Sequence, residues 1–333
     1  MGEKLRVVQF GLGPIGKEAA KLILNKSRFE LVGAIDIAEE LVGRDVGEVL
    51  GVDRELGFTV SKDAAAALEA SRPDVVLHTT TSFLDRVEDQ LMTCIHAGAH
   101  VVSSTEELFY PYYRDPEFCR RIDAAAREKG VAVIGTGVNP GFAMDVLPLT
   151  LTGVCAEVQK VRAERIVDAS HRRAPLQKKI GAGLTETAFK RLVDENKLGH
   201  IGLLESLLAI ADALGWHPDT IDERVDPVLA QQPVETAFVR VEAGQVAGIR
   251  HTCVATLKGA PIIELELQMY VGAEHPCDRV VLEGTPPLQM EIPGGIFGDT
   301  ATVAALVNTA ARIVAAAPGL RTMLDLSIPR AVF

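Results

Sequence analysis

The sequence has few aromatic residues, few cysteines and no cluster of basic residues, and each shortage excludes a class of protein. Aromatic side chains make up 5% of the 333 residues, and the five cysteines lie far apart without the spacing of a zinc site or a disulfide framework. No apolar stretch approaches the roughly 18 residues that a membrane span needs. The formal charge of -11 argues against binding to nucleic acid or to a membrane surface. We therefore expect a soluble, cytoplasmic protein with reduced thiols that acts on small molecules.

Apolar residues are abundant, at 47%, and the chain is about twice as long as a typical domain, so we expect two domains with real cores. Over residues 1–140, short apolar runs alternate with segments of helical periodicity. This alternation is typical of a doubly wound parallel sheet, an α/β arrangement of the Rossmann type.

The stretch "FGLGPIG" follows the first apolar run, residues 5–10, and precedes a helical pattern. Gly11, Gly13 and Gly16 form the G-x-G-x-x-G motif of dinucleotide-binding turns, and Pro14 and Ile15 complete the predicted cofactor loop. Asp36 ends the second apolar run, where an acid accepts hydrogen bonds from the adenosine ribose and repels a 2′-phosphate. The pattern favours NAD, and the nearby cation Arg44 leaves NADP open.

Two adjacent carboxylates, Glu106 and Glu107, follow the apolar run "HVVSS". Because the carboxyl ends of parallel strands share one edge, we expect both to lie beside the crevice where open sheets bind ligands. Thr79 and Thr80 follow another predicted strand, and we expect them to contact the cofactor there. The alternative for the two glutamates is that they only cap the next short turn.

Residues 141–298 change pattern: long segments of alternating polarity, among them "VETAFVRVEAG", predict the strands of a mainly antiparallel sheet in an α+β domain for substrate binding or oligomerisation. Residues 299–333 contain an apolar helical pattern that we expect to run toward Gly319 and to pack back on the first domain. Exposed strands in the second domain suggest a homodimer.

Six stretches in this order resemble a known group: "FGLGPIG", "STEELFYP", "GTGVNPGFAMD", "VDASHRRAPLQKKIGAGL", "GHIGLLES" and "IPGGIFGDTATVAALVN". The chain resembles the dihydrodipicolinate-reductase-like superfamily, and within it the 2,4-diaminopentanoate dehydrogenases and native NAD(P)-dependent amine dehydrogenases. The resemblance implies reversible oxidative deamination of a primary amine, or reductive amination of a ketone or aldehyde with ammonia. It also implies a catalytic glutamate at Glu106, with Glu107 as the alternative.

Four further residues are candidates for substrate binding, each with a plainer structural reading. Asn139 either presents its amide to the ligand or satisfies its own turn, and Met144 either shapes an apolar pocket or is core. Asp168 either binds a second amino group or pairs with a neighbouring arginine. His200 resembles a cavity-lining position of the family, but a histidine at a helix start is often a cap.

Three alternative functions have less support from the sequence. The stretch "HRRAPLQKKIGAGLT" departs from the "HHxxKxDAPSGT"-like stretch of dihydrodipicolinate reductases, which disfavours reduction of a cyclic imine. A semialdehyde dehydrogenase needs a cysteine nucleophile in the crevice, but Cys94 and Cys119 fall in predicted helices. A nicotinamide-sensing regulator needs a recognition element that no segment offers.

Overall fold

The computed structural model describes residues 4–332, which divide into two compact units. The first comprises Met1–Phe142 and Phe297–Phe333, and the second Ala143–Ile296. Among the described residues, no helix combines the length and apolarity required to cross a membrane.

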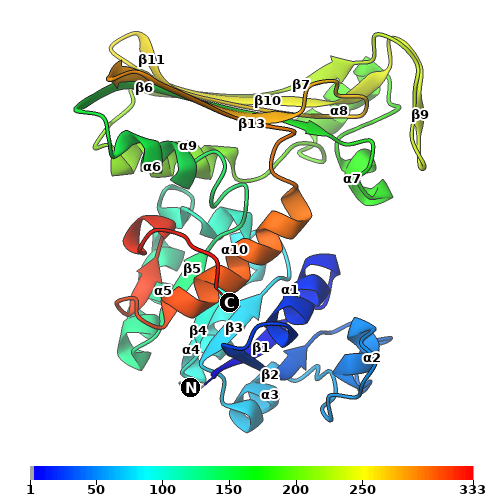
Figure 1. Cartoon of the computed structure of the whole chain (residues 1–333), viewed down its shortest axis with the longest axis vertical. Coiled ribbons are helices and arrows are strands. Elements are labelled where there is room, and N and C mark those ends of the chain that lie inside the picture. The colour runs from blue at the N-terminus through cyan, green and yellow to red at the C-terminus, as the bar shows by residue number, and fades with distance from the viewer. Residues whose placement is uncertain (1–3, 333) are drawn as a thin grey trace. The chain divides into compact units, whose positions relative to one another are not determined.

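The first unit is built on a six-stranded sheet in the order β14-β5-β4-β3-β1-β2, in which every neighbouring pair is parallel (Figure 1). Its strands are β1 Leu5–Phe10, β2 Phe29–Ile35, β3 Val75–His78, β4 His100–Ser103, β5 Ala132–Gly135 and β14 Gly319–Arg321. Its helices are α1 Pro14–Leu24, α2 Val46–Leu50, α3 Ala64–Ser71, α4 Glu88–His96, α5 Pro116–Lys129 and α10 Gly298–Ile313. Four 3₁₀ turns complete it: η1 Leu84–Arg86, η2 Glu106–Leu108, η3 Pro111–Tyr113 and η4 Met323–Asp325.

Helices cover both faces of this sheet. On one face, α1 and α10 pack against each other and α10 lies on β3 and β4; on the other, α3, α4 and α5 pack side by side. The strands are buried on both faces, which explains their continuous apolar runs. The carboxyl ends of β1, β3, β4 and β5 therefore lie at one edge of the sheet.

The second unit contains a mixed six-stranded sheet in the order β13-β12-β6-β11-β10-β7, in which only β6 and β11 pair in parallel among the described strands, and a separate two-stranded sheet of β8 and β9. Its strands are β6 Glu157–Asp168, β7 Thr220–Leu229, β8 Val234–Glu235, β9 Arg240–Val241, β10 Val246–Leu257, β11 Ala260–Tyr270, β12 Cys277–Thr285 and β13 Leu288–Pro293. Its helices are α6 Val146–Thr152, α7 Ala174–Lys179, α8 Glu186–Asp194 and α9 Leu203–Ala213. The predicted fold class, a Rossmann-type sheet plus a mainly antiparallel α+β part, is confirmed.

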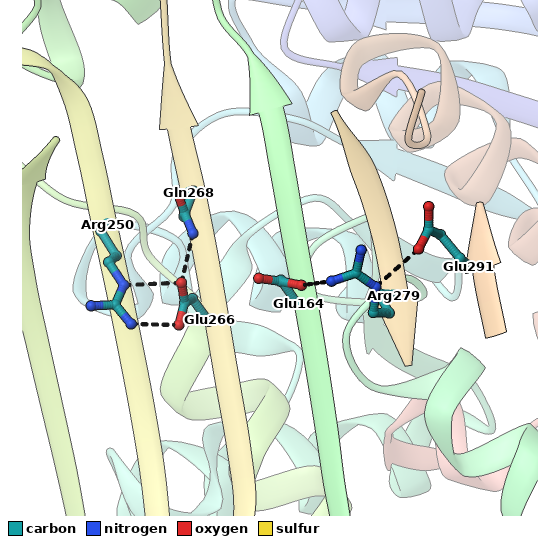
Figure 2. Close-up of polar contacts among 6 residues, drawn as sticks. All are labelled: Glu164, Arg250, Glu266, Gln268, Arg279 and Glu291. Carbon is teal, nitrogen blue, oxygen red and sulfur yellow. Dashed lines mark hydrogen bonds and ion pairs between the residues drawn. The ribbon is translucent and has the colours of Figure 1, made fainter. Parts of the chain in front are cut away.

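One face of the second sheet packs on helices and the other is polar. Alternate side chains on that polar face form ion pairs across the strands, as Figure 2 shows for Arg250–Glu266, Arg279–Glu164 and Arg279–Glu291. Gln268 donates to Glu266 within the same strand. This alternation of apolar and charged residues is what the sequence pattern predicts for a half-covered sheet.

Two local predictions were wrong. The stretch "VETAFVRVEAG" is not one long strand but the hairpin of β8 and β9, because the Thr236 hydroxyl accepts hydrogen bonds from the backbone N–H groups of Phe238 and Val239 and closes a turn. The helix expected to run toward Gly319 ends at Ile313, where the chain leaves the helix in tight turns with Ala315 N donating to the Arg312 carbonyl oxygen and Ala316 N to that of Ile313. Gly319 instead begins β14, the outermost strand of the parallel sheet.

Candidate functional site

The glycine turn between β1 and α1 is tightly packed on one side and open on the other. Gly11 has φ +91°, and a side chain there would come within 2.5 Å of the Thr79 carbonyl oxygen; a side chain at Gly16 would come within 1.9 Å of the Gly11 carbonyl oxygen. Gly13 is exposed, and a side chain there would meet no atom within 4 Å. The tight packing on one side and the open backbone on the other match the three roles of glycine in this motif.

Helix α1 begins immediately after this turn. Gly13 caps it without a side-chain hydrogen bond, Pro14 occupies the first turn, and no acidic residue lies there. The N–H groups of a first turn carry partial positive charge and attract phosphate. Pro14 is exposed and Ile15 half-buried, so the predicted cofactor loop presents its outer side to solvent in the first unit.

A buried glutamine that the sequence pattern did not point to supports the turn from below. Gln9 is fully buried, and its Nε2 donates to the Gly11 carbonyl oxygen and to Thr79 Oγ1, both at 2.9 Å. Thr79 Oγ1 in turn donates to the Gly11 carbonyl oxygen at 2.9 Å. Thr79 therefore braces the glycine turn from the end of β3, whereas Thr80 is exposed and bonds to Gln90.

Asp36 lies directly after β2, and both of its carboxylate oxygens accept backbone hydrogen bonds. Oδ2 accepts from Leu12 N at 2.6 Å and Oδ1 from Ala38 N at 2.9 Å. The carboxylate thus joins the glycine turn to the loop after β2. Each oxygen retains acceptor capacity for a ribose hydroxyl.

Arg44 contacts the loop after β2. Its NH1 donates to the Glu40 carbonyl oxygen at 3.2 Å, and its NH2 pairs with Glu48 Oε1 at 2.6 Å. The hydrogen bond and charge of Glu48 raise the pKa of Arg44 above its ordinary value. The guanidinium therefore lies on the loop that follows Asp36 and is paired with a carboxylate.

The two adjacent glutamates have different environments. Glu107 is buried: its Oε2 accepts from Leu84 N at 2.8 Å and its Oε1 lies 3.2 Å from Arg114 NH1. Glu106 is half-buried in the same 3₁₀ turn, η2, just beyond the end of β4. The backbone of η2 rests on Gly135 at the end of β5, where a side chain would come within 2.5 Å of the Leu108 carbonyl carbon.

Behind η2, a buried polar chain joins the ends of β3 and β4. His78 Nδ1 lies 2.9 Å from Ser103 Oγ and His78 Nε2 lies 2.7 Å from Gln90 Oε1; Ser103 Oγ bonds to Thr105 Oγ1, which donates to the Thr81 carbonyl oxygen. Burial lowers the pKa of His78 to about 4, although its hydrogen bond to Gln90 opposes the shift. The imidazole is therefore neutral near pH 7.

The structure brings the glycine turn, Asp36, Thr79, Thr80 and the glutamate pair together in the first unit. The predicted substrate residues are divided between the units. Asn139 is half-buried in the segment after β5, whereas Met144, Asp168 and His200 belong to the second unit. Met144 is 1% exposed, Asp168 Oδ1 accepts from Ser170 N, and His200 is half-buried before α9. No group of three metal-ligating side chains occurs among residues 4–332.

Comparison with known proteins agrees with this architecture. Residues 142–333 match the family of the 2,4-diaminopentanoate dehydrogenase C-terminal domain, and residues 5–134 match that of the dihydrodipicolinate reductase N-terminus. The 2,4-diaminopentanoate dehydrogenase of Acetoanaerobium sticklandii is 33% identical over 343 residues, covering 99% of this chain and 95% of that protein. The chain belongs to the 2,4-diaminopentanoate dehydrogenase family. The predicted resemblance is thus confirmed.

Two further proteins that are similar to this chain are named amine dehydrogenases. That of Streptomyces virginiae is 27% identical over 358 residues, covering 98% of both proteins. The solved structure of the amine dehydrogenase from Mycobacterium smegmatis superimposes with a TM-score of 0.86 at 27% identity and covers 99% of each chain. The similarity therefore extends over both units.

Proposed function

We propose that this protein is an NAD(P)-dependent amine dehydrogenase that catalyses the reversible oxidative deamination of a primary amine. In the reverse direction, it aminates a ketone or aldehyde with ammonia. The end-to-end similarity to proteins named 2,4-diaminopentanoate dehydrogenase and amine dehydrogenase supports the reaction class. The half-buried carboxylate of Glu106, held in η2 at the ligand-binding edge of the sheet, is the observation that connects this class to the present chain.

The reaction removes a hydride from the carbon that carries the amine. Bound NAD(P)⁺ supplies the hydride acceptor. The substrate becomes a cationic iminium, and water then converts it to a carbonyl compound and ammonia. A carboxylate beside the iminium stabilises its positive charge, and it also takes the proton that the ammonium or the water must lose.

Glu107 is better suited to a structural role than to proton transfer. Both oxygens of Glu107 are engaged, one by the backbone of Leu84 and one by Arg114. Protonating or moving Glu107 would disturb both contacts, so we assign it to holding η2 in place. Glu106 is then the catalytic carboxylate, and Glu107 positions it.

The cofactor is a nicotinamide dinucleotide, and we propose a preference for NAD with use of NADP. A 2′-phosphate near the Asp36 carboxylate is repelled by about 1–4 kcal/mol per pair of charges at 4 Å, depending on solvent exposure. Arg44 offers an opposing attraction. Its pairing with Glu48 is exposed on both sides and therefore weak, so Arg44 exchanges Glu48 for a phosphate at small cost.

For substrate binding, Asn139, Met144, Asp168 and His200 stay predictions. Asp168 is the residue that would distinguish a diamino substrate from a simple amine, because a second ammonium group needs a carboxylate partner. If Asp168 serves this purpose, the chain is a 2,4-diaminopentanoate dehydrogenase proper. If it does not, a monoamine is the substrate.

The test follows reduced-cofactor consumption with a panel of ketones and aldehydes, with and without ammonia. We expect ammonia-dependent oxidation of NADH, and more slowly of NADPH, by the wild-type protein. Glu106→Gln should lower kcat by roughly 10²–10⁴ with unchanged affinity for NADH, because acid–base assistance is lost. Glu107→Gln, at the positioning residue, is measured in parallel and should lower kcat by less than Glu106→Gln. Consumption that ignores ammonia, or that requires a preformed cyclic imine, would refute the proposal in favour of an imine reductase.

We also propose a homodimer in the cytoplasm. The polar face of the second sheet carries charges of both signs that are satisfied within one chain, such as the pairs Arg250–Glu266 and Arg279–Glu164 (Figure 2). Such a face can bury against a second copy without leaving charges uncompensated. Light scattering coupled to size exclusion tests this, and a reversal of charge at Arg279 should shift the mass toward that of the monomer.

A further inference from the structure

The first unit contains a buried cation that has no counter-ion among residues 4–332. Arg312 lies in the last turn of α10 and is 9% exposed. Its Nε, NH1 and NH2 atoms are all buried, and none forms a hydrogen bond. An arginine stays protonated in proteins, so this position holds a buried positive charge.

The end of the described chain covers this side of α10. Asn308 and Arg312 are one helical turn apart and therefore share a face of the helix. Val332 N donates to Asn308 Oδ1 at 2.9 Å, so the end of the described chain lies against α10. The tail of residues 326–332 thus crosses α10 next to Arg312, and this tail is itself mostly exposed.

The tail adds a second positive charge near the buried guanidinium of Arg312. Burial first, and then the nearby charge of Arg330, lower the pKa of Arg312 below its ordinary value. The end of α10 offers only partial compensation, equivalent to roughly half a negative charge, and its contribution is confined to the last turn. The buried, unsatisfied guanidinium of Arg312, with the second cation Arg330 nearby, favours a bound anion, since buried polar groups in native proteins are almost always satisfied.

We propose that Arg312 anchors a binding site for a small oxyanion of the phosphate or carboxylate class, enclosed between α10 and the tail of residues 326–332. The planar guanidinium offers five N–H donors in the geometry that binds two oxygens of one oxyanion. Arg330 adds a second positive charge. Because the guanidinium is inaccessible to solvent, the oxyanion enters when the tail lifts and is covered when the tail returns.

This site is separate from the dinucleotide turn. Thr302, in the first turns of α10, bonds to the backbone of Val138 beyond β5, whereas Arg312 lies at the other end of the helix. The oxyanion therefore stabilises the packing of α10 and the tail, and it does not take part in hydride transfer. Its binding can be measured without substrate or cofactor.

The experiment compares thermal unfolding of the full chain in inorganic phosphate and in chloride at equal ionic strength and pH. For the wild type we expect phosphate to raise Tm by roughly 3–6 °C when it is present far above its Kd. Arg312→Met, which keeps an unbranched side chain of similar length, should lose this increment. In chloride its Tm should equal or exceed that of the wild type, because a buried uncompensated charge has been removed.

Controls separate this site from other effects of phosphate. Arg120→Met removes an exposed cation on α5 and should keep the full increment, and Arg312→Lys should keep part of it. Phosphate also stabilises proteins generally and is attracted to the glycine turn, so the series is repeated with saturating NADH. Carboxylates such as citrate or acetate replace phosphate in a parallel arm to distinguish the two sources of oxyanion.

Two outcomes would overturn the proposal. One is a phosphate increment that is equal in the wild type and in Arg312→Met, which would assign it to other sites. The other is no increment in the wild type together with a large loss of Tm for Arg312→Met in chloride. That result would mean that the chain itself supplies the counter-ion.

Discussion

Protonation of the buried imidazole of His78 should make the first unit sensitive to acid. Its pKa is lowered from an ordinary value of 6.5 to about 4, chiefly by burial. Between these two values the unfolded chain binds a proton that the folded chain does not, so stability falls as pH falls through this window. A difference of 2.5 pKa units at about 1.4 kcal/mol each corresponds to a full loss of ~3 kcal/mol.

The variant His78→Asn isolates this contribution, because asparagine keeps polar atoms but does not titrate. At pH 7 the variant should be less stable than the wild type, since it loses the edge-on contact with Phe10 and part of the bonding to Ser103 and Gln90. At pH 4.5 that deficit should shrink by roughly 2.5 kcal/mol, because only the wild type is then penalised for excluding a proton. All other titrating groups are common to both proteins and cancel.

The assay is urea unfolding of both proteins at a series of pH values. Unfolding of the first unit is followed by a spectroscopic probe placed in that unit. A ¹³C titration of the His78 ring provides a direct second reading. A deficit that stays constant from pH 7 to pH 4.5, or a ring that titrates near 6.5, would refute the reasoning. Either result would mean that water reaches the imidazole or that a charge compensates it.

Three further predictions concern Glu107, the glycine turn and the second unit. Glu107→Gln keeps an acceptor for Leu84 N but loses the charge that faces Arg114; kcat should fall with little change in KM for the amine, and an unchanged kcat measured by steady-state kinetics would contradict a positioning role. Gly16→Ala should abolish NADH binding measured by fluorescence, because the new methyl group would collide with the turn, and retained affinity would count against the dinucleotide site. Asp278→Ala should destabilise the second unit by about 3–5 kcal/mol in chemical unfolding, since it leaves the buried Arg165 guanidinium without its partner; replacing both residues with apolar ones should restore most of the loss.

Much of the fold could be predicted from the sequence because its information is local. Continuous apolar runs of four to seven residues and the intervening helical periods determine a parallel sheet, and the spacing from Gly16 to Asp36 follows from one strand, one turn and one helix. The strand β14 could not be predicted: three residues with a glycine give no periodic signal, and only pairing with β5 makes them a strand.

The candidate site was predictable in type but not in detail. The local sequence pattern predicted two carboxylates at the end of a strand, which is β4. The family resemblance then implied that one of them takes part in amine oxidation. Only the tertiary structure distinguishes their environments, because Glu107 is held by Leu84, which is 23 residues away in the chain. The same holds for Gln9 beneath the glycine turn and for the missing counter-ion of Arg312. Hydrogen-bond satisfaction and burial depend on distant neighbours, and these are decided only when the chain has folded.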